Sequence, residues 1–131
     1  MIVTFTFEGE TFTLTREGTS LGADGGERLR VLGAVVASAW LYGPEALLAS
    51  VEARTGRSFE GVVSFGFPDG DEFLGPGVAL AYLDEELVVE ERVFRAFVRA
   101  FGAAALELDR RFGVEPANAA ALARRLDALV D

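Results

Sequence analysis

The sequence predicts an α+β fold. We expect a single domain over residues 1–131, built mainly from antiparallel sheet, with one short helix in the middle and two C-terminal helices packed on one face. Three patterns predict it. Apolar and polar residues alternate near the N-terminus, as in a half-buried antiparallel pair. Turn-forming residues divide the central third into short segments rich in β-formers. From residue 91 onward, apolar residues recur at helical spacing.

The first element is a hairpin in which threonine alternates with apolar residues. A two-residue turn at Gly9-Glu10, with glycine first as a type II′ turn prefers, sets the register. This register gives an apolar face and a threonine face through the pairs Phe7–Phe12, Phe5–Leu14, Thr6–Thr13 and Thr4–Thr15. Residues 17–27 follow as a glycine-rich linker, because they lack the Gly-Lys-Ser/Thr ending of a phosphate-binding loop.

The segment Arg28 to Tyr42 supports two interpretations. Its apolar residues recur at helical spacing, but it is rich in valine and aromatic residues, and Gly33 is unfavourable inside a helix. We favour a long strand. A short helix then begins at Pro44, which suits the first helical position, and is closed by Gly56.

Strands and turns alternate in the central region. A strand is predicted from Val62 to Phe67, followed by a turn at Pro68-Asp69-Gly70-Asp71 and a resumed strand from Glu72 to Leu74. Gly75-Pro76-Gly77 breaks this strand. A second hairpin then pairs Val78–Leu83 with Glu86–Val89 about Asp84-Glu85, with Tyr82 opposite Leu87 and Leu80 opposite Val89.

Two helices complete the chain. The longest runs from Glu91 to Phe112 along an apolar stripe, and Gly113 suits the position after its end. Its exposed side offers the ion pairs Glu91–Arg95 and Glu107–Arg111. The last helix begins at Pro116, ends near Val130 and packs through Leu122, Leu126 and Leu129.

The composition removes most catalytic chemistry. The chain has no histidine or cysteine, and all 12 of its basic residues are arginine, so the commonest general base, the thiol nucleophile and the Schiff-base lysine are missing. Asp69-Gly70-Asp71-Glu72 lacks the spacing of a calcium-binding loop. We therefore expect no enzyme activity, no cofactor and no metal site.

The location is predicted from the same observations. The absence of cysteine suits the cytoplasm, and the chain opens on an alternating pattern in place of a signal peptide. The longest uncharged run, Val31 to Pro44, is shorter than the roughly 20 residues of a membrane span. We expect a cytoplasmic protein with no membrane partner.

The acidic residues are unevenly distributed. The chain has 21 acidic and 12 basic residues, a net charge of −9. Nine of the acids and no base lie between Arg57 and Arg92, which leaves 12 acids to balance the 12 arginines. The nine are Glu60, Asp69, Asp71, Glu72, Asp84, Glu85, Glu86, Glu90 and Glu91. Held on hairpins, they would attract a basic partner and repel nucleic acid, although a solvated sheet face is the alternative.

Eight residues are the candidate contacts for that partner. They are the carboxylates Asp69, Asp71, Glu72, Asp84, Glu85 and Glu86, with the aromatic residues Trp40 and Tyr42 as anchors. For a single tryptophan in a small domain, a place in the core is the competing interpretation.

The order of elements over residues 44–101 resembles a known family. Glu72-Phe73-Leu74-Gly75-Pro76-Gly77-Val78 leads into a strand, Tyr82-Leu83-Asp84-Glu85-Glu86-Leu87-Val88-Val89 forms an acidic hairpin, and Glu91 to Phe101 is a helix bearing phenylalanine. This resembles small acidic immunity proteins of bacterial toxin–immunity systems, including contact-dependent growth inhibition. The resemblance implies a non-catalytic inhibitor, monomeric or weakly dimeric, that binds a basic toxin, often a nuclease. The alternative is an acidic, dimeric secretion chaperone that holds an effector segment, with its dimer seam on the last helix.

Overall fold

A computed structural model describes residues 1–26, 30–59, 62–67 and 77–130. Within them the chain forms two antiparallel sheets and a set of helices, which confirms the predicted α+β class. The sheets have the strand orders β1-β2-β3 and β4-β5-β6-β7. In chain order the elements are β1 (Ile2–Phe7), β2 (Glu10–Glu17), β3 (Ser20–Gly25), α1 (Arg30–Tyr42), α2 (Pro44–Ala53), β4 (Arg57–Phe59), β5 (Val63–Gly66), β6 (Val78–Tyr82), β7 (Glu85–Val89), α3 (Glu91–Phe112) and α4 (Ala119–Asp127).

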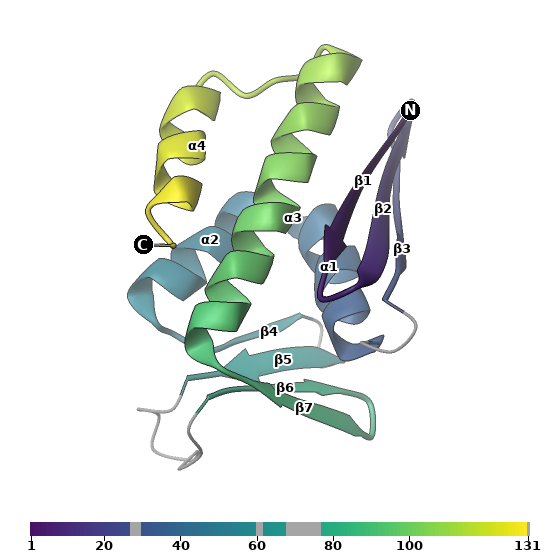
Figure 1. The fold of residues 1–131 in the computed structure, drawn as a ribbon. Helices are drawn as coiled ribbons and strands as arrows, with labels where there is room; N and C mark the ends of the chain where they lie inside the picture. The colour runs from purple at the N-terminus through teal and green to yellow at the C-terminus, as the bar shows by residue number, and fades with distance from the viewer. Residues whose placement is uncertain (27–29, 60–61, 68–76, 131) are drawn as a thin grey trace.

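The long helix α3 is the centre of the arrangement (Figure 1). The three-stranded sheet lies to one side, where β1 and β2 contact α3 and β3 contacts α1. The four-stranded sheet lies below, and α1 contacts its strands β5, β6 and β7. On the other side, α4 packs against α3 and α2. One cluster of buried side chains connects both sheets with the helices.

Aromatic rings on α3 fill the core between the sheets. Phe97 is fully buried, and its ring lies 5.2 Å from Phe7 and 5.5 Å from Phe12 on the first sheet. One turn earlier, the ring of Phe94 lies 5.3 Å from Phe65 on the second sheet. Neighbouring positions on one helix therefore hold the two sheets in place, because large aromatic side chains bury the most apolar area.

The first hairpin forms with a register different from the predicted one. Phe5 lies opposite Phe12 and Phe7 opposite Glu10, so the turn is Glu8-Gly9, not Gly9-Glu10. Both turn residues have positive φ, 52° and 78°, as a type I′ turn requires. The shift is two residues, and side chains alternate with period two, so the predicted apolar and threonine faces are unchanged.

The glycine-rich segment after this hairpin is a strand, not a linker. β3 pairs with β2 along its whole length, and Gly22 lies opposite Thr15. A Cβ at Gly22 would lie 2.6 Å from Thr15 Oγ1, so the Thr15 side chain occupies the space that a side chain at Gly22 would need.

The prediction of a strand over residues 28–42 is wrong, because α1 is a helix from Arg30 to Tyr42. Its helical spacing buries residues on one side, among them Val31, Val35 and Trp40, and this burial outweighs their β-propensity. Gly33 fits because a Cβ there would lie 2.7 Å from the Gly25 carbonyl oxygen. The helix passes through a bend of 115° into α2.

α2 begins at Pro44 as predicted. It ends at Ala53, and the residue that closes it is Arg54, in the left-handed conformation with φ 52°, and not Gly56. The next strand, β4, was not predicted. The predicted turn at residues 68–71 and the resumed strand at 72–74 lie outside the described residues.

The second hairpin repeats the error of the first. Leu80 lies opposite Leu87 and Val78 opposite Val89, so its turn is Leu83-Asp84 and not Asp84-Glu85. Again the register moves by two residues and the faces are preserved.

The predicted bounds of α3 are confirmed, and Gly113 follows it with φ 84°. The predicted pairs Glu91–Arg95 and Glu107–Arg111 form at 3.4 and 2.7 Å. α4 is shorter than predicted, but its predicted contacts Leu122, Leu126 and Leu129 are buried. No single helix among the described residues has both the length and the hydropathy to cross a membrane.

Candidate partner-binding surface

The candidate surface lies at one end of the four-stranded sheet, and α1 spans that end. At the start of α1, Arg30 Nη1 lies 2.9 Å from Glu85 Oε1 on the edge strand β7. At the other end of α1, the ring of Tyr42 stacks on Phe59 of the opposite edge strand β4, with 6.1 Å between centroids. The helix therefore crosses from one edge of the sheet to the other and links the two groups of predicted contact residues, Tyr42 and the acidic hairpin.

Three exposed apolar side chains accompany this end of the sheet. Leu83 is 69% exposed, Tyr42 51% and Val62 44%. The Leu83 amide donates to the Val62 carbonyl at 3.2 Å, which fastens the β6–β7 turn to the segment that leads into β5. Behind them, Phe59, Val63 and Tyr82 are neighbours across the strands. We call Tyr42, Val62 and Leu83 the apolar patch.

Leu83 has an unfavourable backbone conformation as well as an exposed side chain. Its φ is 54°, in the left-handed region, where a bulky residue is an outlier and glycine or asparagine is ordinary. The left-handed conformation costs an L-residue about 1–2 kcal/mol. Strain of this kind, found on a fully presented side chain, is a recognised mark of functional sites.

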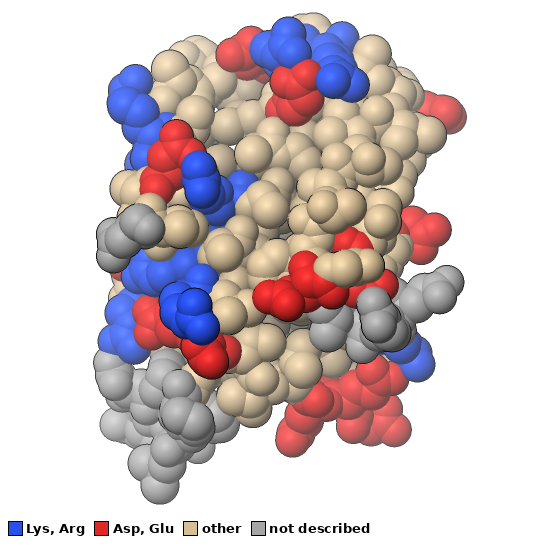
Figure 2. Space-filling view, viewed as in Figure 1, with Lys and Arg blue, Asp and Glu red and all other residues tan. Residues whose placement is uncertain are grey.

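Carboxylates border the apolar patch. Asp84 and Glu86 are exposed, and neither has an arginine partner among the residues that the structure describes, whereas Glu85 pairs with Arg30. We call Asp84, Glu85 and Glu86 the acidic rim. Figure 2 shows acidic side chains gathered at the lower right, where Figure 1 places the end of the β6–β7 hairpin. Of the nine acids between Arg57 and Arg92, four lie outside the described residues, and Glu85, Glu90 and Glu91 pair with arginines. The unpaired charge that the structure describes in this segment is that of Asp84 and Glu86.

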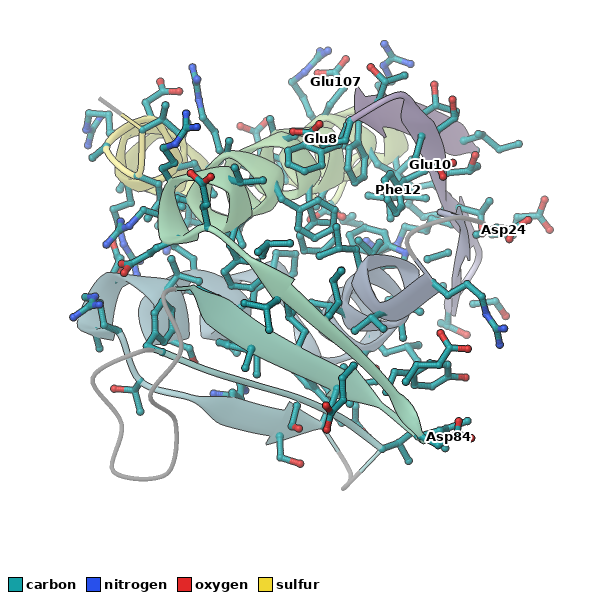
Figure 3. All side chains as sticks on the ribbon, turned by 60° about the horizontal axis from the view of Figure 1, so that its bottom comes forward. Glu8, Glu10, Phe12, Asp24, Asp84 and Glu107 are labelled. Carbon is teal, nitrogen blue, oxygen red and sulfur yellow. The ribbon has the colours of Figure 1, made fainter. Side chains whose placement is uncertain are left out.

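A shallow hollow of about 430 Å³ lies beside the rim. Asp24 of β3, Arg30 of α1 and Tyr82 of β6 contribute to its wall, so both sheets meet there. Asp24 Oδ1 accepts a hydrogen bond from the amide of Gly25 at 2.8 Å. Figure 3 shows Asp24 and Asp84 pointing outward on the same side of the molecule, from different sheets. Asp24 was missed because its segment was interpreted as a linker.

Trp40 does not belong to this surface. It is 3% exposed, and its indole Nε1 donates to the Thr15 carbonyl at 3.1 Å. The prediction of Trp40 as an anchor is therefore wrong, and the alternative of a core tryptophan holds. Asp69, Asp71 and Glu72 lie outside the described residues. Sequence patterns gave no reason to select Leu83 or Val62.

Arginines pair with the carboxylates on the helices, as Arg30 does with Glu85, whereas Asp84 and Glu86 have no such partner among the described residues. Hydrogen bonds from Arg125 lower the pKa of Glu52, and those from Arg54 lower the pKa of Glu91. On the last turns of α3, hydrogen bonds from Arg110 and Arg111 lower the pKa of Glu107. Figure 2 shows this mixture of both signs over the upper and left parts of the molecule. Among the described residues, Asp84 and Glu86 at the sheet end have no arginine partner, as is also the case for Glu8 and Glu17 of the first hairpin.

The geometry of this surface is suited to contact with another protein. No group of three or more carboxylates suited to a metal ion occurs in the described part of the chain. An apolar centre with a charged border is instead the anatomy of a protein–protein interface. Comparison with models of protein families, with curated proteins and with solved structures finds no match to this chain.

Proposed function

We propose that this protein is an inhibitor of the immunity-protein kind, which binds a basic protein toxin through the apolar patch and the acidic rim and thereby blocks the toxin. The observation that carries the proposal is Leu83, an exposed leucine in a strained conformation beside Asp84 and Glu86, which have no arginine partner in the described part of the chain. A hairpin selected for stability alone would place glycine or asparagine at that position.

The charge of the rim supports a basic protein as the partner. Asp84 and Glu86 have no arginine partner among the residues that the structure describes, so their negative charge faces solvent. The field of this charge repels phosphates, which disfavours nucleic acid and anionic lipid, and it steers a cationic protein into contact. Complementary charge raises association rates towards about 10⁸ M⁻¹s⁻¹ at low salt, which suits an inhibitor that must capture a folded toxin quickly.

The apolar patch supplies the affinity that charge alone does not. Exposed charges are screened within about 10 Å at 0.1 M salt, so they set the association rate more than the lifetime of a complex. Tyr42 and Leu83 add apolar area that becomes buried on binding, and aromatic anchors of this kind dominate interface energetics. A nuclease is the favoured class of toxin, because its nucleic-acid groove is cationic and rim carboxylates would take the place of phosphates there.

The experiment begins with the partner. Protein bound by this chain in a lysate of its source cells is identified, and the partner is then expressed in a sensitive host alone and together with the chain. We expect a basic protein that stops growth alone and is harmless when co-expressed. A captured partner that has no effect on growth would refute the inhibitor proposal.

Variants then locate the surface with the purified partner. Asp84→Asn combined with Glu86→Gln removes two rim charges, and Glu107→Gln combined with Glu115→Gln removes two charges from the far end of α3. We expect the rim variant to bind on the order of tenfold more slowly at low salt, and the control to match the parent. Equal association rates for both variants would show that binding occurs elsewhere.

The alternative of a dimeric secretion chaperone has less support. Its predicted seam is the outer side of α4, which presents Ala120, Ala123 and Arg124 and no large exposed hydrophobic residue. Asp127 on the same helix is held by Arg99 at 3.1 Å. Size-exclusion chromatography with light scattering separates the two functions, because the proposal requires a monomer that binds a folded partner.

A further inference from the structure

A cavity of about 220 Å³ lies where α2, α3 and α4 meet. Its apolar wall includes Leu48 of α2, Ala105 of α3, and Leu122 and Leu126 of α4. The helices approach closely at its edge, since a Cβ at Gly102 would lie 2.5 Å from a methyl carbon of Leu126. A rigid, preformed apolar cavity is the usual form of a small-molecule site.

The size of the cavity limits the ligand. An engineered cavity of about 150 Å³ lined by aliphatic and aromatic side chains binds benzene in another protein. A volume of about 220 Å³ therefore has room for one six-membered ring with a short substituent.

Two carboxylates are the charged groups on the wall, Asp109 of α3 and Glu45 of α2. Asp109 is mostly buried, with 19% of its side chain exposed. Arg16 Nη1 donates to its Oδ1 at 2.8 Å, and among the described residues nothing donates to the second oxygen. Burial raises the pKa of Asp109 more strongly than Arg16 lowers it. The carboxylate is therefore incompletely stabilised and would gain from a second cationic donor.

We propose that this cavity binds a small primary amine that carries one ring or a branched aliphatic group. The apolar group lies against Leu48, Ala105 and Leu122, and the ammonium donates to the free oxygen of Asp109. Glu45 lies at the same wall, and its Oε1 is 3.3 Å from Arg125 Nη1. Its negative charge adds to the preference of the cavity for a cation over an anion. This proposal does not depend on the proposed toxin-binding function.

The test uses benzylamine, benzyl alcohol and benzoate, which share a ring and differ in charge. Amide chemical shifts of the ¹⁵N-labelled full-length chain are followed during titration to millimolar concentration. We expect benzylamine to shift amides of Leu48, Ala105 and Leu122, benzyl alcohol to bind more weakly and benzoate not to bind. Failure of benzylamine to bind, equal binding of all three, or shifts confined to other regions would each overturn the proposal.

A variant pair isolates the carboxylate. Asp109→Asn keeps the shape of the side chain and is expected to weaken benzylamine binding about tenfold, while benzyl alcohol binding stays the same, because a charge-assisted hydrogen bond is lost. Glu107→Gln, two residues away on the outside of α3, is the matched control and is expected to bind as the parent does. If Asp109→Asn binds benzylamine as tightly as the parent, the assigned role of Asp109 is wrong; the titration of the parent remains decisive even if that variant does not fold.

Discussion

The two hairpins of this protein have turns of the same length, but the first packs its side chains into the core and the second exposes its turn to solvent. Glu8 in the first and Leu83 in the second each occupy the first turn position with positive φ. The first turn continues with a glycine, Gly9, also at positive φ, and its strands press phenylalanines onto Phe97. The second turn places a leucine in the strained position and exposes it. Both hairpins therefore have a non-glycine residue at positive φ in the first turn position. They differ in that the first buries its phenylalanines against α3, whereas the second exposes Leu83.

Ion pairs repeat this contrast. Arg16 of β2 pairs with Asp109 of α3 at 2.8 Å, and the two side chains are 22% and 19% exposed. Arg30 of α1 pairs with Glu85 of β7 at 2.9 Å, but these side chains are 63% and 38% exposed. Loss of Arg16 would leave a desolvated carboxylate, whereas loss of Arg30 would leave an exposed one, so the first pair is the costlier one to break.

Phe97→Ala is expected to have the largest effect on stability and tests whether the first hairpin contributes more to the core than the second. The substitution removes the ring on which Phe5, Phe7 and Phe12 of the first sheet pack, and we expect a loss of about 3–5 kcal/mol in the free energy of unfolding. Urea denaturation followed by circular dichroism measures it. Leu83→Ala at the exposed turn is the comparison and should change stability by less than about 1 kcal/mol. Similar losses for the two variants would contradict the division of roles between the hairpins.

Arg16→Met tests the buried ion pair. It leaves Asp109 desolvated without its donor, and we expect a loss of about 2 kcal/mol at neutral pH. Arg99→Met breaks an exposed pair with Asp127 and is the matched control, expected to lose no more than a few tenths of a kcal/mol.

The stability lost in Arg16→Met is also expected to depend on pH. The pKa of Asp109 is raised above its ordinary value of 3.8 in the folded protein, so the folded state holds this proton more tightly than the unfolded chain. The contribution of Asp109 to stability is therefore present below pH 3.8 and is lost as pH rises through the folded pKa. Removal of Arg16 raises that pKa further and should extend the decline to higher pH. Thermal unfolding of parent and variant between pH 4 and pH 8 shows whether the added instability grows with pH; a constant difference would contradict the assignment.

Leu83→Asn and Glu8→Asn form a matched pair at the two turns. Asparagine tolerates positive φ, so each substitution should add up to about 1 kcal/mol to the free energy of unfolding. Only Leu83→Asn removes part of the apolar patch, so only this variant should lose affinity for the partner. Asp84 directly follows Leu83 in the chain, and Figure 3 shows Glu8 far from Asp84. Glu8→Asn is therefore a suitable control. A destabilised Leu83→Asn variant would show that the leucine is not strained, and unchanged affinity would remove it from the interface.

The comparison of the hairpins also shows how far the sequence determines the fold. The strand faces were predicted correctly because period-two alternation is a property of the strand alone. The register was missed by two residues in both hairpins, because the turn was placed one residue late. At the first turn Gly9 fits the first position as well as the second, and at the second turn nothing local marks Leu83 as a turn residue.

The error at α1 has a tertiary cause. Valines and Trp40 favour a strand locally, but the gain from burying one helical side against both sheets is larger. In the candidate site, the excess of acidic residues could be predicted from the sequence, because the net charge of a segment is the sum of the charges of its residues. The apolar patch could not be predicted from the sequence, because Val62 is placed beside Leu83 by a backbone hydrogen bond between two separate turns.

Arg30→Gln is expected to have the smallest effect on stability and the most specific effect on binding. Arg30 is the described arginine that pairs with the acidic rim, and loss of an exposed pair should change stability by no more than a few tenths of a kcal/mol. The rim becomes more negative, so association with a basic partner should accelerate about twofold at low salt. The gain should vanish at about 1 M salt, where the screening length is about 3 Å. Arg99→Gln removes the same charge from the helical side and should accelerate association less, because it lies away from the rim. Slower association of Arg30→Gln would instead place Arg30 itself in contact with the partner and refute a purely acidic rim.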